Sequence, residues 1–304
     1  MINFIVNPSA GNMKSYAVWK KLEVYLRKKR VEYRYFLTEV EGDAKKISYS
    51  ISDTKEYVSI VIVGGEGTFN EALDGLNINE RISVAYIPTG FSRDLARGLK
   101  LPKSPIKCLK RILNPKMTRN IDYGILSFSN GTEHRRFIMS AGIGLDAELY
   151  LNFNAKREVS KLPVVRVFKK WYSKLSVLYS AGSSRGYVLI DGFKKIEFNH
   201  ILLVSSHIHP YSLGGLRLAP KADNLDGELT ICIVHQRSKL RLLRIMLSAM
   251  FGNHLKYTGV RSYDCNELKI HLESAMSVHT DGRDCGKCTD IHLHCVRQKL
   301  RFLL

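Results

Sequence analysis

The strongest structural constraint in the chain is the run at residues 57–63, which reads Tyr-Val-Ser-Ile-Val-Ile-Val and is apolar on both faces. A strand of this kind belongs inside a parallel sheet that is covered by helices. The turn Gly64-Gly65-Glu66-Gly67-Thr68 follows it directly, and residues 69–76 then have a helical pattern. Glycines let a phosphate approach the backbone, and a helix N-terminus offers free N–H groups to an anion. The sequence therefore predicts a phosphate-binding turn here.

The same turn is expected to cap the helix that follows it. Thr68 has a hydroxyl that suits an N-cap position, and Glu71 stands three residues later. This spacing is that of a capping box, in which two side chains satisfy the free N–H groups of the first turn. We therefore predict that the helix starts just after Thr68.

Strand and helix signals alternate through the first part of the chain. Strands are expected at residues 2–6, 32–37, 57–63 and 82–87, and helices after residue 11 and at 43–52, 69–76, 94–98 and 107–113. This alternation predicts an α/β domain with a parallel sheet over residues 1–122.

Beyond Arg119 the helical signals become rare. Strands are expected at residues 120–126, 136–140, 186–190, 198–205, 229–234, 268–272 and 291–296, with helices at 159–180 and 239–253. This pattern predicts a second domain over residues 123–296 that is mainly antiparallel and β-rich.

Three loops follow strands of the predicted parallel sheet, at residues 7–11, 64–70 and 88–94. Ligands of open α/β sheets bind beyond the carboxyl ends of the strands. Gly11 and Gly90 allow close backbone approach, and Arg93 and Arg97 add positive charge. Together the loops favour a nucleotide site over ordinary connections. The turn after residue 63 is neither a P-loop nor a Gly-x-Gly-x-x-Gly dinucleotide turn.

The chain has 47 basic and 28 acidic residues, a formal net charge of +19. This excess predicts an anionic partner, which could be nucleotide phosphates, an anionic membrane surface or nucleic acid. Residues 1–8 do not resemble a signal peptide, and no apolar run approaches the ~18–20 residues of a spanning helix. A cytoplasmic protein is therefore expected. The basic stretches 156–174 and 237–244 fit docking to anionic lipid, and equally fit solvated helix faces.

The last of the six cysteines lie close together in the sequence. Cys285 and Cys288 form a Cys-x-x-Cys pair that is followed by His292, His294 and Cys295. One such pair is half of a zinc site, and the two histidines could share one face of a strand. A hairpin turn followed by an ordinary strand is the simpler interpretation, and both remain open.

These loops, with motifs further along, resemble the diacylglycerol kinase catalytic-domain family, which includes soluble bacterial diacylglycerol kinases and sphingosine kinases. The resemblance rests on Asn7-Pro8-Ser9-Ala10-Gly11, residues 64–71 and Ile87-Pro88-Thr89-Gly90. It continues through residues 141–148 (Ala-Gly-Ile-Gly-Leu-Asp-Ala-Glu), 218–223 with Asp226-Gly227, and 277–282 (Ser-Val-His-Thr-Asp-Gly). It thus covers nearly the whole chain in the expected order.

The resemblance implies a lipid kinase that binds ATP and Mg²⁺ between its two domains and phosphorylates a diacylglycerol-like lipid. The residues implied at the nucleotide are Asn7, Pro8, Ser9, Ala10, Gly11, Thr38, Gly64, Gly65, Glu66, Gly67, Thr68, Phe69, Asn70, Gly90 and Arg93. The implied metal ligands are Asp223, Asp226 and Glu228. The candidate catalytic residues are Asp281 of the final motif and Asp284, which follows it. The implied partners are the lipid substrate and an anionic membrane surface to which the protein binds peripherally. A nucleic-acid partner would explain none of the motifs. The tail, residues 297–304, is expected to return to the first domain, and a homodimer is compatible with the sequence.

The chain departs from the family pattern in three places. Glu66 stands where the family usually has Asp. In the third loop, Phe91 stands where the family has a Thr whose hydroxyl contacts phosphate, and Arg93 stands where it has Asn. Arg283 stands where the family has the Glu that is taken as the general base, and arginine does not deprotonate in proteins. Asp284 is the nearest substitute. Two hypotheses therefore stay open, an active lipid kinase and a catalytically impaired pseudokinase that binds nucleotide or lipid. A kinase of a soluble substrate, like the NAD kinases, fits the turn but not the downstream motifs.

Overall fold

The computed structural model describes residues 1–304 except 116, 129–133, 156–176 and 179–180. The chain divides into two compact units, Met1–Tyr123 with Val296–Leu304, and Gly124–Cys295. The two boundaries between the units, after Tyr123 and after Cys295, each lie one residue from the boundaries expected at 122 and 296. None of the helices formed by the described residues combines the length and the apolar character that crossing a bilayer requires.

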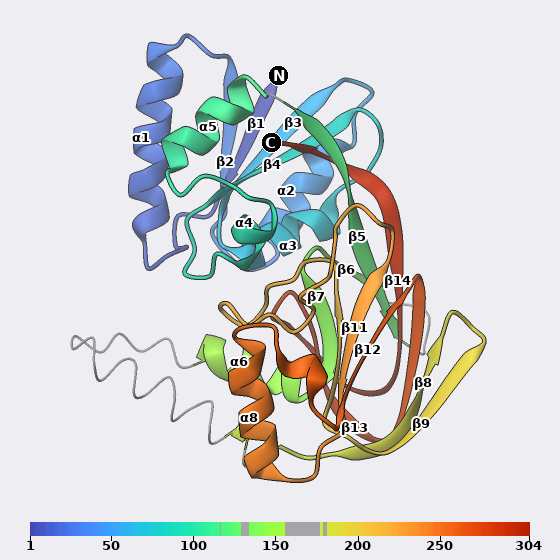
Figure 1. Ribbon diagram of the computed structural model, residues 1–304. Coiled ribbons are helices and arrows are strands. Elements are labelled where there is room, and N and C mark those ends of the chain that lie inside the picture. Colours follow the sequence, from blue (N-terminus) through green and yellow to red (C-terminus); the bar gives the residue numbers. More distant parts are fainter. Residues whose placement is uncertain (116, 129–133, 156–176, 179–180) are drawn as a thin grey trace, which may run out of the picture. The chain divides into compact units, whose positions relative to one another are not determined.

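The first unit is an α/β layer structure, as predicted (Figure 1). Its parallel strands lie in the order β4, β3, β1, β2. The strands are β1 (Ile2–Val6), β2 (Tyr33–Leu37), β3 (Val58–Gly64) and β4 (Ile82–Pro88). The helices are α1 (Lys14–Lys28), α2 (Asp43–Ser52), α3 (Glu66–Gly75), α4 (Asp94–Gly98) and α5 (Pro105–Leu113). β3 and β4 are buried along nearly their whole length, as expected of strands inside a sheet that helices cover.

The end of the chain joins this sheet. Phe302 pairs with Val84 of β4 in parallel register and is fully buried, with its ring close to that of Phe69. The first unit therefore contains residues from both ends of the sequence.

The helix after the glycine-rich turn differs from the prediction. α3 begins at Glu66 with Gly65 as its N-cap residue, and no side chain caps it. The Thr68 hydroxyl instead accepts a hydrogen bond from the Asn7 side chain at 2.8 Å. The Glu71 carboxylate accepts hydrogen bonds from the backbone N–H groups of Gly42 and Ala44. The predicted capping box is thus wrong, because both side chains bind segments that are distant in the sequence.

The second unit is β-rich and antiparallel, as predicted (Figure 1). The buried apolar side chains of its strands form a core. Its strands are β5 (Thr118–Phe128, which begins in the first unit), β6 (His134–Phe137), β7 (Ser140–Gly144), β8 (Ser184–Ile190), β9 (Lys194–Ile201), β10 (Leu203–His207), β11 (Leu229–Val234), β12 (Val260–Cys265), β13 (Glu267–Thr280) and β14 (Arg283–Leu303, which ends in the first unit). Neighbouring strands follow the order β12, β11, β10, β7, β13, β14.

Two predicted strands are each two strands in the structure. The strand expected at 198–205 breaks at Leu202, so that β9 pairs with β8 while β10 pairs with β7 and β11. The strand expected at 136–140 breaks at Ile138 and Met139, whose N–H groups bind the Asp281 carboxylate. An unbroken apolar run does not reveal such changes of partner.

The helices of the second unit were predicted in part. α8 (Lys239–Ala249) lies within the expected stretch 239–253, followed by the short helix η1 (His254–Lys256). α6 (Leu145–Ala155) was not predicted. The helix expected at 159–180 lies almost entirely outside the described residues.

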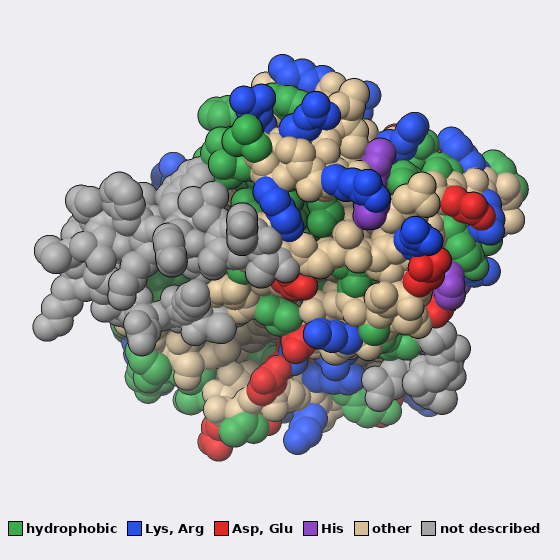
Figure 2. Space-filling view, turned by 90° about the horizontal axis from the view of Figure 1, so that it is seen from below, with side chains coloured by type: hydrophobic (Ala, Val, Ile, Leu, Met, Phe, Trp, Pro, Cys, Tyr) green, Lys and Arg blue, Asp and Glu red, His purple; other side chains and the backbone are tan. Residues whose placement is uncertain are grey.

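Figure 2 shows Lys and Arg side chains scattered among hydrophobic and neutral ones on the face that it presents. The positive charge is not gathered into one patch there. The excess of basic residues therefore does not locate a binding surface by itself.

Candidate functional site

The three predicted loops of the first unit lie against one another. The backbone N–H groups of Thr89 and Gly90 both donate to the carbonyl of Gly64, at 2.9 and 3.3 Å. The N–H of Asn7 donates to the carbonyl of Val63, and its side chain binds Thr68. The carboxyl ends of β1, β3 and β4 are thus joined by hydrogen bonds, and the structure brings the predicted loops together.

Glycine is required at two of these contacts. Gly11 has a φ of +64°, and a Cβ there would lie 2.2 Å from the carbonyl oxygen of Thr89. A Cβ on Gly90 would lie 2.7 Å from the Cα of Gly65. The loops approach so closely that no side chain fits between them at these positions.

Gly67 is different, because the folded chain does not require glycine there. It is exposed, and a Cβ at this position would have no heavy atom within 4 Å. It lies in the first turn of α3, where the N–H groups of Gly67 and Thr68 have no hydrogen-bond partner among the described residues. Free N–H groups at the positive end of a helix dipole form an anion site. The open backbone at Gly67 therefore suits a phosphate group.

The other residues that we predicted to bind the nucleotide differ in how far they are exposed to solvent. Ser9 is exposed, and Pro8 and Ala10 are partly exposed. Thr38 is buried directly after β2, and its N–H donates to the carbonyl of Val6. Phe69 is 1% exposed, and its ring packs against those of Tyr86 and Phe302. Asn70 is also fully buried. Phe69 thus belongs to the core beneath the loops, and the exposed backbone of the turn is what remains accessible to a ligand.

Glu66 and Arg93, two of the residues that depart from the family pattern, bind the protein itself. The Glu66 carboxylate accepts a hydrogen bond from the N–H of Leu95 at 2.9 Å and so satisfies the first turn of α4. The Arg93 guanidinium donates to the carbonyl of Pro102 at 3.3 Å. Both side chains stabilise the loop from Pro88 to α4. The contact of Arg93 gives no support to its predicted role at the phosphates.

In the second unit, Asp281 and Gly282 form the tight turn between β13 and β14. Thr280 pairs with Arg283, and the two residues between them have φ values of 48° and 81°. Two positive φ angles are typical of a type I′ hairpin turn, for which Asp-Gly is a preferred pair. A Cβ on Gly282 would lie 2.6 Å from the ring of Tyr150.

The Asp281 carboxylate is held by three consecutive backbone N–H groups. It accepts hydrogen bonds from Ile138, Met139 and Ser140 at 2.8, 2.8 and 3.0 Å, and the residue is only 5% exposed. These contacts fix the turn against the segment between β6 and β7. They give Asp281 a structural role and leave its predicted role in catalysis without support.

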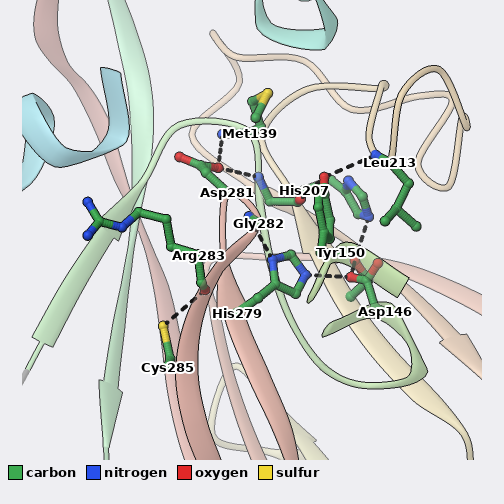
Figure 3. A network of polar contacts seen from close by, with 12 residues as sticks. Met139, Asp146, Tyr150, His207, Leu213, His279, Asp281, Gly282, Arg283 and Cys285 are labelled. Carbon is green, nitrogen blue, oxygen red and sulfur yellow. Dashed lines mark hydrogen bonds and ion pairs between the residues drawn. The ribbon is translucent and has the colours of Figure 1, made fainter. Parts of the chain in front are cut away.

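A buried polar network lies beside this turn (Figure 3). Nε2 of His279 donates to the Asp146 carboxylate at 2.9 Å, while Nδ1 of His279 accepts from the N–H of Gly282 at 3.1 Å. The hydroxyl of Ser205 donates to the same carboxylate and contacts Nε2 of His207 at 2.8 Å. These four side chains are fully buried. The network connects the first turn of α6 to the β13–β14 turn.

The glycines of the motif at 141–148 make room for this network. A Cβ on Gly142 would lie 2.5 Å from the Asp146 carboxylate. Gly144 has a φ of +89°, and a Cβ there would lie 2.4 Å from the carbonyl of Leu202. The motif therefore joins the end of β7 directly to the start of α6 and so brings Asp146 against His279.

Burial and charge shift the pKa values of this network. Burial alone would raise the pKa of Asp146, but the imidazoles of His279 and His207 and the Ser205 hydroxyl outweigh it, so the pKa is lowered. Burial lowers the pKa of His207 to about 4, although the Asp146 charge opposes the shift. Burial lowers the pKa of His209 to about 4 as well. We therefore expect an ionised Asp146 and neutral His207 and His209 near neutral pH.

Arg283 and Asp284 follow the turn on β14. The Arg283 side chain extends away from the His279 imidazole (Figure 3). Asp284 pairs with His279 in the strand register and is exposed. One of its carboxylate oxygens accepts from the N–H of Gly286 at 2.9 Å, and the other has no hydrogen-bond partner among the described residues. Asp284 therefore keeps a free acceptor, which Asp281 does not.

The predicted metal ligands lie before β11. Burial raises the pKa of Asp226, and the negative charges of Asp223 and Asp264 raise it further. One Asp226 oxygen accepts from the N–H of Glu228 at 2.9 Å. The described residues contain no group of three or more His, Cys, Asp or Glu side chains that could hold a metal ion. The predicted metal site at Asp223, Asp226 and Glu228 therefore stays a prediction.

The cysteine-rich segment does not form the hairpin turn that we considered. Cys285 and Cys288 lie within β14, after the turn at Asp281, and both pack against the apolar core with Cys295. His292 and His294 share a face, with ring centroids 5.7 Å apart. His292 contacts Glu267 at 2.8 Å. The three cysteines therefore contact the apolar core, whereas His292 contacts a carboxylate.

The most important residues that the sequence did not single out are Asp146, Ser205 and His207. Asp146 lies in a motif that we noted, but nothing in its spacing shows a partner 133 residues away. Ser205 and His207 are two positions apart on β10 and so lie on one face of the strand. The available signal was the run Ser205-Ser206-His207, which is polar although the strand is completely buried.

Comparisons with known proteins agree with this architecture. The profile of the diacylglycerol kinase catalytic domain matches residues 1–126. That of the YegS C-terminal NAD kinase beta sandwich-like domain matches residues 151–303. The chain is 29% identical to the Bacillus subtilis (strain 168) protein named "Putative lipid kinase YtlR", over 93% of each chain. It is 27% identical to a diacylglycerol kinase of the same organism, over 93% of this chain and 89% of the relative. A solved diacylglycerol kinase structure from Bacillus anthracis str. Sterne shares the fold, with a TM-score of 0.69 and 18% identity over 99% of this chain and 96% of the other.

Proposed function

Because the chain belongs to the diacylglycerol kinase catalytic-domain family, we propose that it transfers the γ-phosphate of ATP to the hydroxyl of a diacylglycerol-like lipid at a membrane surface. The observation that carries this proposal is the cluster of three loops at the carboxyl ends of β1, β3 and β4. These loops surround a helix N-terminus that no side chain caps. Phosphoryl transfer depends mainly on positioning and on charge stabilisation, which such a site supplies.

In this proposal the nucleotide phosphates lie on the first turn of α3, against the N–H groups of Gly67 and Thr68. Glu66 and Arg93 contribute by holding the neighbouring loop in place. Mg²⁺ would neutralise charge on the phosphates when it is bound. Asp223, Asp226 and the chain at Glu228 would hold a cation in the second unit, as the resemblance to the family implies.

We assign Asp284 as the general base that accepts the proton of the lipid hydroxyl. It is exposed and has a free carboxylate oxygen, whereas the carboxylate of Asp281 is saturated by backbone N–H groups. The alternative function is a pseudokinase that binds nucleotide or lipid without efficient turnover. The observation that favours it is Arg283 at the position of the expected glutamate.

Gly67→Ala tests the nucleotide part of the proposal. We expect ATP affinity to fall at least about tenfold, because the new methyl group occupies the space of a phosphate at the helix N-terminus. The melting temperature should not fall, since alanine is the better helix former and the Cβ meets no atom. Calorimetric titration with ATP and thermal unfolding measure the two quantities.

Gly90→Ala is the companion variant, because its Cβ would collide with Gly65. It should lower both the ATP affinity and the melting temperature. Unchanged ATP affinity in Gly67→Ala would rule out phosphates on this turn.

Transfer of labelled phosphate from ATP to diacylglycerol tests the activity and the general base together. Asp284→Ala should lower the rate roughly 10²-fold or more, and Arg283→Glu should raise it, because general-base assistance is typically worth ~10²–10⁴-fold. Glu273→Ala, which removes an exposed acid on β13, is the control and should leave the rate unchanged.

The two hypotheses predict different results in this assay. A pseudokinase would bind ATP without transfer in the wild type and would gain transfer in Arg283→Glu. Full wild-type activity in Asp284→Ala would remove Asp284 from the mechanism.

A further inference from the structure

α8 (Lys239–Ala249) has apolar side chains on two opposite sides. Its inner side packs into the second unit through Leu242, Ile245, Met246 and Ala249, which are almost completely buried. Its outer side carries Leu240 and Leu247, which are 62% and 40% exposed. Phe251, just after the helix, is 72% exposed. Water-exposed leucine and phenylalanine are not explained by the packing of the unit.

The exposed apolar residues follow one helical stripe. Leu240, Arg244, Leu247 and Phe251 are separated by four, three and four positions, which is the spacing of a single helix face. Met250, 44% exposed, lies beside the end of the stripe. The outer side of α8 is therefore a narrow apolar band with an arginine within it.

The charge around this band has one sign. No Asp or Glu occurs between residues 229 and 263. Arg237, Arg241, Arg244 and Lys256 are exposed, and none of the ion pairs among the described residues includes them. Lys239 is different, because it donates to the carbonyls of Leu178 and Ala181 and so helps to hold α8 in place.

We propose that the outer face of α8, defined by Leu240, Arg241, Arg244, Leu247 and Phe251, docks on an anionic lipid surface. A helix with leucine and phenylalanine along one line, and with arginines within and beside that line, lies in the interface of a bilayer with its apolar side chains among the acyl chains. The arginines then meet the phosphate groups of anionic lipids. Nucleic acid would use the arginines but would leave Leu240 and Phe251 without a function.

This inference rests on the proposed function in one respect, since an enzyme with a lipid acceptor has to reach the bilayer. The contact itself requires neither ATP nor turnover. It also assigns the contact to a defined part of the second unit, where α8 lies along one side of the strands (Figure 1).

Sedimentation with lipid vesicles tests the proposal on the full chain in the absence of ATP. The wild type should bind vesicles of equal parts phosphatidylcholine and phosphatidylglycerol, and should bind pure phosphatidylcholine at least about tenfold more weakly. The double variant Leu240→Ser with Phe251→Ser should lose at least about tenfold in binding to the anionic vesicles. Arg241→Gln with Arg244→Gln should reduce the preference for anionic lipid and the sensitivity to salt.

The matched control is Val24→Ser with Phe193→Ser, which removes two apolar side chains that are 68% and 80% exposed elsewhere. This control should bind vesicles as the wild type does. The proposal is overturned if the α8 double variant binds as the wild type does, or if the control loses as much. It is also overturned if the wild type ignores vesicles and instead binds duplex DNA through the arginines.

Failure of the docking surface can be separated from failure of the kinase activity. With a short-chain diacylglycerol that is dispersed in water, the α8 double variant should phosphorylate as fast as the wild type. If that variant shows normal phosphate transfer and also normal vesicle binding, α8 is not the docking surface, and the assignment as a kinase still holds.

Discussion

Asp146→Ala is expected to lower the free energy of unfolding by roughly 3–5 kcal/mol. The carboxylate receives hydrogen bonds from the buried Nε2–H of His279 and from the Ser205 hydroxyl. One carboxylate oxygen, Oδ2, accepts both hydrogen bonds, so alanine leaves both donors without their acceptor in a site that is closed to water. Hydrogen bonds to a charged group are among the strongest single contributions to stability. Urea denaturation followed by circular dichroism measures the loss.

Glu148→Ala provides the control for this variant. Glu148 also lies in the first turn of α6 and has no hydrogen bond or ion pair among the described residues. Its replacement should change stability by less than about 1 kcal/mol. A similarly small loss in Asp146→Ala would show that the network does not hold α6 against the β13–β14 turn.

Acidification is expected to produce the second large effect. The pKa of His207 and that of His209 are both lowered by burial to about 4, whereas an unfolded histidine titrates near 6.5. Between these values the unfolded chain binds more protons than the native one. The stability that these residues retain above about pH 6.5 is therefore lost progressively as the pH falls towards about 4. Each proton contributes a slope of about 1.4 kcal/mol per pH unit.

Urea unfolding at several pH values between about 7.5 and 5 measures this slope. His209→Gln should reduce it by about one proton, because the side chain then no longer titrates. His134→Gln, at an exposed position on β6, is the control and should leave the slope as it is in the wild type. A stability that is constant over this range would contradict the buried neutral state of both histidines.

The α/β half of the molecule follows closely from the sequence because its signals are local. β3 is apolar on both faces and ends in glycines, so its place inside a parallel sheet is determined within a few residues. The three loops could be placed at one edge because parallel strands share the direction of their carboxyl ends. Their actual contacts, such as that of Thr89 and Gly90 with Gly64, refine that expectation.

The β-rich half follows less closely because its decisive contacts are distant in sequence. Ile138 and Met139 leave the strand pattern because their N–H groups bind Asp281, more than a hundred residues later. The chain changes its partner strand at Leu202, and an apolar run in the sequence does not show where such a change occurs. The same reason explains why the predicted capping box is wrong, since the Glu71 carboxylate binds the N–H groups of Gly42 and Ala44, which are distant in the sequence.

The sequence predicts which residues lie at the candidate site better than it predicts what their side chains do there. The backbone positions from Gly64 to Thr68 lie where the glycines suggested. Side-chain roles were harder, because Arg93 reaches Pro102 and Asp281 reaches three backbone N–H groups. A motif identifies which residues matter, and only the contacts show whether a residue meets a ligand or supports the fold.

The most direct test of the central claim is the transfer of labelled phosphate from ATP to diacylglycerol in mixed micelles with Mg²⁺, with the wild type and Gly90→Ala side by side. We predict that the phosphorylated lipid accumulates with time and in proportion to wild-type enzyme, and that Gly90→Ala produces at most about a tenth of it. No labelled lipid above background from the wild type, with none gained in Arg283→Glu, would contradict the assignment as a lipid kinase.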